Sequence, residues 1–226
     1  MAKNKLKKFA ENAEMRHVIE PNWSDVNADN FELKGKWREE FFKNDNPIVV
    51  ELGCGRGEYT FGLAMRDRNV NHIGMDIKGN RLWNGAKWAQ QEGLTNIAFL
   101  RTRIELLDKA FAEGEVNEIW ITFPDPQIKF KRMKHRMTNP EFLDMYKKVL
   151  ADDGVVHLKC DSEFLHEYIH GIVQMSGYPV EEAYHDIDFQ LKEQSPDHVL
   201  FTIQTYYEQM WREQGKPINY LRFRFK

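Results

Sequence analysis

The amino-acid sequence predicts an α/β fold with a doubly wound, mostly parallel sheet. From residue 48 onward, short apolar runs alternate with segments of helical periodicity that are long enough to cross over between parallel strands. The first apolar run leads directly into three closely spaced glycines, and a helical segment follows them. Strands separated by helices in this way are typical of βαβ units.

Six strands and four helices follow from these patterns. The expected strands are 48–52, 71–77, 97–102, 118–123, 155–160 and 219–225. The expected helices are 57–66, 80–92, 140–150 and 162–175. The last strand alternates polar and apolar side chains, which indicates that one of its faces is buried.

The composition indicates one globular domain with an N-terminal extension. The chain has 226 residues, of which 42% are hydrophobic and 30% charged, and no apolar run reaches the length of a membrane helix. We expect residues 1–30 to form a basic extension that is mobile or ordered by a partner, and residues 31–226 to form a single domain. With Cys54 and Cys160 as the only cysteines, a disulfide framework is disfavoured and a reducing cytoplasm is expected.

The turn after the first strand is the most informative segment. Gly53, Gly55 and Gly57 alternate directly before a predicted helix, so a nucleotide-like ligand could approach the backbone closely. The dinucleotide fingerprint would need a glycine where Glu58 stands. The acid Glu51, two places before the first glycine, makes the segment resemble motif I of the class I S-adenosylmethionine-dependent methyltransferases. An ordinary tight turn is the alternative interpretation.

Two further acids follow the ends of predicted strands. Asp76 closes the second strand, where a carboxylate can bind the hydroxyls of a ribose or cap the next helix. Asp125 follows the fourth strand within Phe123-Pro124-Asp125-Pro126. Because the flanking prolines restrict the backbone, we expect the carboxylate of Asp125 to be held rigidly beside the same cleft.

A basic segment follows this motif. Five cations lie within eight residues, namely Lys129, Lys131, Arg132, Lys134 and Arg136. Although the formal net charge of the chain is −3, one local cluster of this kind is enough to contact a phosphate backbone. A solvated surface loop is the alternative.

Taken together, these features resemble the tRNA (guanine-N7-)-methyltransferases over residues 48–226. That family combines the acid-led glycine motif, an acid after the second strand, F-P-D-P with a basic loop, an Asp after the fifth strand and a late T-x-Y-E. In this sequence Asp161 and Thr205-Tyr206-Tyr207-Glu208 supply the last two. The resemblance implies a class I methyltransferase (Rossmann-like) fold, with a seven-stranded, mostly parallel sheet and an antiparallel C-terminal strand.

The resemblance also implies a reaction and a set of site residues. It implies methyl transfer from S-adenosylmethionine to N7 of a variable-loop guanosine of tRNA, in the cytoplasm, by a monomer or homodimer without a metal or a membrane. The implied cofactor-binding residues are Glu51, Gly53, Gly55, Gly57, Asp76, Thr102 and Asp125. The implied tRNA-binding residues are Lys129, Lys131, Arg132, Asp161, Thr205, Tyr206, Tyr207 and Glu208.

Asp125 is the expected catalytic residue. Guanine N7 has a lone pair and no proton, so methyl transfer needs alignment and favourable electrostatics more than a general base. We expect Asp125 to accept hydrogen bonds from the N1–H and N2–H₂ edge of guanine. Two departures from the family pattern are Thr102, where many members have an acid, and Gln127, where an aromatic residue is common.

Other functions are disfavoured or left open. His166-Glu167-Tyr168-Ile169-His170 matches the zinc motif H-E-x-x-H, but Val173 and Ser176 occupy the later positions of its extended form. We therefore expect this helix to pack on the sheet and not to hold a catalytic zinc. A methyltransferase on another RNA and a non-catalytic RNA-binding relative remain open. Glu58 disfavours a nicotinamide dehydrogenase.

Overall fold

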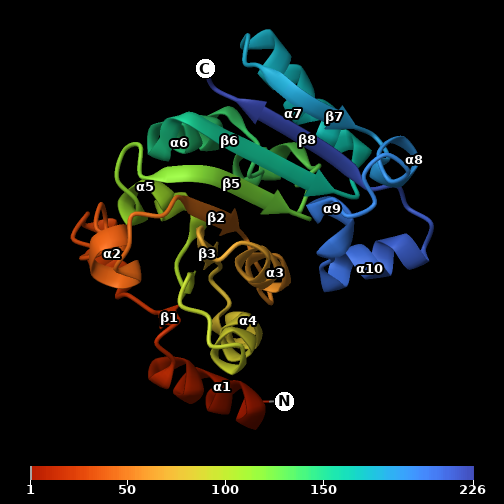
Figure 1. Ribbon diagram of the computed structural model, residues 1–226. Helices are drawn as coiled ribbons and strands as arrows, with labels where there is room; N and C mark the ends of the chain where they lie inside the picture. Colours follow the sequence, from red (N-terminus) through yellow and green to blue (C-terminus); the bar gives the residue numbers. More distant parts are fainter. Residues whose placement is uncertain (1) are drawn as a thin grey trace.

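The computed structural model describes residues 2–226 and shows one continuous sheet with helices on both faces (Figure 1). Its strand order is β1-β4-β3-β2-β5-β6-β8-β7. The strands are β1 (Val18–Ile19), β2 (Ile48–Leu52), β3 (Asn71–Met75), β4 (Ile97–Leu100), β5 (Val116–Thr122), β6 (Leu150–Cys160), β7 (Val180–Tyr184) and β8 (Asn219–Arg224). Neighbours from β1 to β6 are parallel, whereas β8 is antiparallel to both β6 and β7. The predicted α/β fold with an antiparallel C-terminal strand is confirmed.

Helices flank and connect the strands, and those that follow β2, β3, β4 and β5 link strands of the parallel part of the sheet. The helices are α1 (Ala2–Glu14), α2 (Trp23–Asn27), α3 (Glu58–Arg66), α4 (Gly79–Gln91), α5 (Leu107–Ala110), α6 (Pro140–Val149), α7 (Glu163–Met175), α8 (Ile187–Gln190), α9 (Val199–Thr202) and α10 (Tyr206–Glu213). A π-helical segment, η1 (Trp37–Phe42), and two 3₁₀ segments, η2 (Ile104–Leu106) and η3 (Phe130–His135), complete the fold.

The core is divided by the sheet into two layers. On one face, α5, α6 and α7 pack against the strands together with the aromatic side chains that precede β2. On the other face, α3 and α4 pack beside the segment from α8 to β8. Because the central strands are covered on both faces, their sequences are nearly continuous apolar runs such as Ile48–Leu52.

Two strands were not predicted from the sequence. β7 is a half-exposed strand that lies at the edge of the sheet and carries two glutamates, so it lacks an apolar run. β1 has two residues and pairs with β4 at the opposite edge. Within residues 2–226 the sheet therefore has eight strands, one more than the resemblance implied, and the additional short strand comes from the N-terminal extension.

The N-terminal extension is packed on the domain in the described residues. α1 lies beside α4 (Figure 1), where Asn12 Nδ2 donates to the Gly79 carbonyl at 2.9 Å and Trp83 Nε1 donates to Glu11 at 2.6 Å. A domain boundary near residue 30 stays a prediction. No helix within residues 2–226 has the length and apolarity to cross a membrane.

Candidate active site

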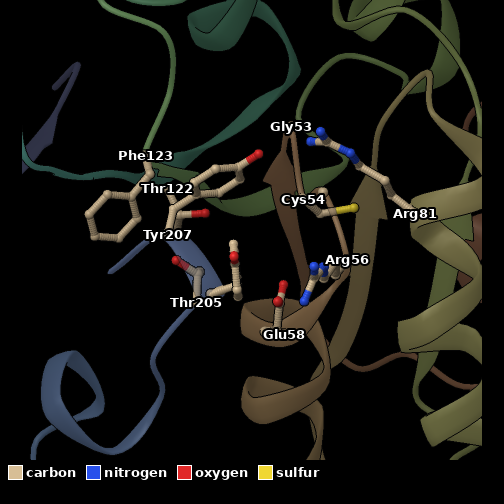
Figure 2. A pocket seen from close by; sticks show the side chains of 11 residues that line it. Gly53, Cys54, Arg56, Glu58, Arg81, Thr122, Phe123, Thr205 and Tyr207 are labelled. Atoms are coloured by element: carbon tan, nitrogen blue, oxygen red, sulfur yellow. The ribbon is translucent and has the colours of Figure 1, made fainter. Parts of the chain in front are cut away.

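The carboxyl ends of β2 and β5 open onto a pocket, as expected for a doubly wound sheet. The pocket has a volume of about 170 Å³ and is lined by residues from three segments, which are 53–58, 122–123 and 205–207. The side chain of Arg81 reaches it from α4. Figure 2 shows Glu58 at the start of α3 facing Thr205, which lies on the opposite wall. Segments distant in the sequence therefore meet at the end of the sheet.

The glycine turn has the backbone that its sequence predicts. Gly53, Gly55 and Gly57 have φ angles of 74°, 56° and 79°, in the left-handed region that other residues rarely adopt. A Cβ on Gly57 would lie 2.5 Å from the ring of Phe99, so a larger residue would also clash there. A Cβ on Gly55 would meet only the Gly53 carbonyl, at 4.0 Å. The turn thus leaves room beside Gly55 that a ligand can occupy.

Glu51 supports this turn from within the protein. Its carboxylate is 2% exposed and accepts hydrogen bonds from the Thr60 amide at 2.8 Å, from the Thr60 hydroxyl, and from the Thr122 hydroxyl at 2.6 Å. Burial raises the pKa of Glu51 to about 7. The carboxylate therefore joins β2, α3 and β5 through protein groups.

Asp76 connects the glycine turn with the start of α4. One of its oxygens accepts from the Gly55 amide at 2.9 Å, and the other accepts from the Lys78 amide at 2.8 Å. The next residue, Ile77, lines a second pocket together with Thr102 and Trp23. Both interpretations of Asp76 are therefore compatible with its position, because it contacts the glycine turn and also stabilises the start of the α4 segment.

Asp125 is exposed and lies outside the lining of the first pocket. It lines a neighbouring pocket with Lys129 and Arg132, and one of its oxygens accepts from the Gln127 amide at 3.0 Å. Phe123, which does line the first pocket, has a positive φ of 49°. A non-glycine residue in this region is uncommon and often marks a functional turn. The F-P-D-P segment thus joins the two pockets.

The basic segment is exposed with one exception. The side chains of Lys129, Lys131, Arg132 and Lys134 face solvent. Arg136 is 4% exposed, and its guanidinium lies 4.1 Å from the ring centroid of Tyr168 on α7. The expectation that all five cations are available to phosphates is therefore wrong for Arg136.

Arg136 instead holds the F-P-D-P loop in place. Its Nε donates to the Pro126 carbonyl at 3.0 Å, and its Nη2 donates to the Gln127 carbonyl at 3.1 Å. The guanidinium thus binds these two carbonyls and packs against the aromatic side chains of Phe164 and Tyr168 on α7. Sequence alone cannot separate such a cation from its exposed neighbours, because they share one charge run.

The T-x-Y-E segment forms the other wall of the first pocket. Thr205 caps α10 by accepting a hydrogen bond from the Glu208 amide at 3.1 Å. Tyr206 and Tyr207 are 49% and 42% exposed, and both line the pocket. The Arg56 guanidinium lies 4.3 Å from the ring centroid of Tyr206, so a cation–π contact links the two walls.

The carboxylate of Glu208 is paired with cations inside the protein. Its side chain is fully buried and pairs with Lys159 Nζ at 2.7 Å and with Arg212 Nη2 at 2.9 Å. The predicted contact of this carboxylate with tRNA stays a prediction, and in this structure its partners are protein groups. Lys159 is itself fully buried on β6, and burial lowers its pKa to about 8 although Glu208 favours its charged form. Lys159 also donates to the Leu200 carbonyl at 2.7 Å.

The remaining predicted residues and the residues that were missed complete the site. Asp161 follows β6, is partly buried, and lies 3.7 Å from Lys216 Nζ.

Arg56, Glu58 and Arg81 line the first pocket but were not predicted as site residues. Burial raises the pKa of Glu58. The signal for Glu58 was its place as the first helical residue after the glycine turn.

Comparisons with known proteins identify the family of this chain. A family model described as "Putative methyltransferase" matches residues 45–221. The tRNA (guanine-N(7)-)-methyltransferase of Christiangramia forsetii is 56% identical over 225 residues, covering 100% of this chain and 99% of that protein. The enzyme of the same name from Bacteroides fragilis is 49% identical and covers 99% of this chain and 86% of that protein. The chain belongs to the tRNA (guanine-N7-)-methyltransferase family.

Solved structures support the class I methyltransferase fold of this family member. An antibiotic-related methyltransferase matches with a TM-score of 0.61 and 17% identity, over 85% of this chain and 94% of that one. The 16S rRNA methyltransferase KamB matches with a TM-score of 0.61 and 13% identity, over 82% of this chain and 90% of that one. At these identities the likeness concerns the fold alone.

Proposed function

We propose that this chain transfers a methyl group from S-adenosylmethionine to N7 of guanosine 46 in the variable loop of tRNA. The observation that carries the proposal is that the chain belongs to the tRNA (guanine-N7-)-methyltransferase family and is 56% identical to one relative over its full length. The geometry agrees with it, because an acid-led glycine turn, an exposed Asp125 and an exposed basic segment lie at one end of the sheet.

The residues present fit S-adenosylmethionine, which supplies a methyl group activated by a sulfonium. The glycine turn leaves open space beside Gly55, where backbone amides and the start of α3 favour a carboxylate. We propose that Asp76, which contacts the Gly55 amide, binds the ribose hydroxyls, and that the pocket lined by Thr102 and Ile77 receives the base. We assign Glu51 the role of holding the turn, and Glu58 the role of offering negative charge within the pocket.

Asp125 and the two tyrosines are proposed to hold the target guanine. The carboxylate of Asp125 accepts from guanine N1–H and N2–H₂ and stabilises the positive charge that develops on the ring. Half-exposed Tyr206 and Tyr207 offer rings on which an unstacked base can lie. Glu208 acts indirectly, because its buried ion pair with Lys159 fixes the helix that carries both tyrosines.

Exposed cations are proposed to hold the tRNA backbone. Lys129, Lys131 and Arg132 follow Asp125 directly, so phosphate contacts there would orient the base beside the carboxylate. Asp161 lies after β6 and is retained as a substrate contact through polar groups of the tRNA. Affinity for tRNA measured between low and moderate salt should fall steeply. A cytoplasmic location and a monomer or homodimer belong to the same proposal.

The proposal is tested by transfer of labelled methyl to unmodified tRNA transcripts. We expect N7-methylguanosine, identified by mass, and its loss when the guanosine at position 46 is replaced. Methylation of a different base, or continued transfer after that replacement, would overturn the assignment of the target. Absence of transfer with normal cofactor binding would point to another RNA substrate.

The role of Asp125 is tested in the same assay. Asp125→Asn keeps the size of the side chain but removes its charge, so kcat should fall about 100-fold or more while the affinity for S-adenosylmethionine stays within about two-fold. Asp45→Asn, at another exposed aspartate, is the matched control and should leave both values unchanged. A kcat of Asp125→Asn close to that of the control would contradict the assignment.

A further inference from the structure

A cluster of two histidines and one glutamate lies away from the proposed active site. His166 and Glu167 belong to α7, and His185 follows β7. One possible ligand atom from each residue lies within 4.8 Å of the other two. His166 Nδ1 is 3.0 Å from Glu167 Oε1, and His185 Nδ1 is 3.5 Å from the same oxygen.

The contacts of His166 favour a positive charge shared between these groups. The ring is fully buried, and its Nε2 lies 3.2 Å from the Tyr220 carbonyl, which can only accept a hydrogen bond. Nε2 therefore carries the hydrogen, and a neutral ring presents a lone pair at Nδ1. That lone pair faces the carboxylate oxygen of Glu167, which is also an acceptor. A neutral imidazole cannot satisfy both contacts, whereas a second proton or a metal cation can.

His185 distinguishes these two possibilities. Its ring centroid lies 4.9 Å from that of His166, and its Nδ1 approaches the carboxylate oxygen that His166 already contacts. A simple ion pair between the His166 imidazolium and the Glu167 carboxylate would not require a second imidazole at the same oxygen. Three donors that converge from two elements are instead typical of ligands around a metal ion.

We propose that His166, Glu167 and His185 bind one divalent transition-metal ion of the zinc type, with water completing the coordination. Imidazole and carboxylate donors suit Zn²⁺. The hydrogen bond from His166 Nε2–H to a backbone carbonyl is the outer contact that metal-binding histidines usually make, since it fixes the tautomer. The expectation that the protein holds no metal would then apply to catalysis only.

The proposed site differs from the zinc-hydrolase motif that the sequence contains. In H-E-x-x-H enzymes the two histidines of the motif bind zinc and the glutamate acts as a base. Here the group that converges includes His185 and Glu167 in place of His170, whose ring centroid is 5.8 Å from that of His166. With the glutamate as a ligand, no base is left for hydrolysis. The ion would therefore have a structural role.

The position of the site indicates what the ion would hold together. It would join α7 to the connection between β7 and α8. α7 also carries Tyr168, against which Arg136 of the F-P-D-P loop packs. α8 carries Asp188, which pairs with Arg212 of α10. A bound ion would thus brace two elements that support opposite sides of the proposed active site.

Metal binding is tested on the full chain after treatment with a chelator. Zn²⁺ is titrated in competition with a chromophoric chelator, and Co²⁺ is titrated while its visible absorption is followed. We expect one equivalent to bind, and we expect His185→Ala and Glu167→Gln each to weaken binding at least about ten-fold. Both side chains are more than half exposed, so these variants should fold. His135→Ala removes an exposed histidine elsewhere and should leave the affinity unchanged.

Two outcomes would overturn the proposal. One is binding that persists at full affinity in His185→Ala and Glu167→Gln. The other is a protein that binds no equivalent of Zn²⁺ or Co²⁺ and whose His166 shows the nitrogen chemical shifts of an imidazolium. Because neither measurement uses RNA or S-adenosylmethionine, their result is independent of the proposed methyl transfer.

Discussion

The two walls of the candidate active site each rest on a buried carboxylate, but the two carboxylates are held differently. Under the glycine turn, Glu51 is surrounded by neutral donors from Thr60 and Thr122. Under the opposite wall, Glu208 pairs with the cations of Lys159 and Arg212. Glu51 is thus held by neutral hydrogen-bond donors, which leaves its pKa raised, whereas the negative charge of Glu208 is balanced by two cations.

The difference follows from how each helix begins. α3 starts after Gly57, which has no side chain to cap it, so Glu51 on β2 accepts the amide of Thr60 in its first turn. α10 starts after Thr205, which caps the helix locally. Because α10 already has its own cap, Glu208 can anchor the helix to β6 instead. A glycine turn open to a ligand therefore needs support from a neighbouring strand.

Removal of the buried cation should have the largest effect on stability. Lys159→Met leaves Glu208 buried with Arg212 alone, and loss of one partner of a buried pair costs about 3 to 5 kcal/mol. The free energy of unfolding from urea titration measures this loss. The double variant Lys159→Met/Glu208→Gln should recover part of it, because no uncompensated charge remains. A single variant within about 1 kcal/mol of the parent would show that the second wall does not depend on this pair.

The neutral setting of Glu51 should produce a pH-dependent stability. Its pKa is raised from 4.5 to about 7 in the folded protein, so the stabilising effect is complete below pH 4.5 and is lost as the pH rises through about 7. The loss amounts to roughly 3 kcal/mol. In Glu51→Gln, which keeps an acceptor and stays uncharged, the free energy of unfolding should lose this dependence.

The comparison with Glu51→Gln needs a control variant at another glutamate. Glu32→Gln removes an exposed carboxylate and should retain the parental change between pH 4.5 and pH 7. Other groups with shifted pKa values that do not interact with Glu51, such as His72, contribute equally to all three proteins and cancel in the differences. Equal pH profiles for the parent and Glu51→Gln would mean that folding does not shift the pKa of Glu51, and the contrast between the walls would disappear.

The first wall could be predicted from the sequence, because local sterics determine it. Three left-handed glycines after an apolar strand are a local pattern, and Glu51 and Asp76 stand at strand ends that periodicity locates. The structure adds a detail: β3 and β4 end at Met75 and Leu100, so Asp76 and Thr102 lie just beyond the strands. By contrast β1 and β7 were missed, since short or half-exposed edge strands carry little apolar signal.

The second wall could be predicted only in part. The T-x-Y-E segment was found by resemblance, but the direction of each side chain depends on partners distant in the sequence. The Glu208 side chain points inward because it pairs with Lys159 on β6. The Arg136 side chain points inward because backbone carbonyls accept its hydrogen bonds and aromatic rings pack against it. A charge in the sequence gives no information about such partners. The same reason explains why His185 was not connected with His166.

The smallest expected effect belongs to the local cap of α10. Thr205→Ala removes the acceptor for the Glu208 amide and should lower the free energy of unfolding by about 1 kcal/mol, whereas Thr205→Ser keeps the hydroxyl and most of the stability. The ion pair of Glu208 with Lys159 would still anchor the helix, so the loss stays small. Thr205→Ala could instead lower the free energy of unfolding as much as Lys159→Met does. The cap and the ion pair would then form one cooperative unit, and the second wall, like the first, would depend on a single buried group.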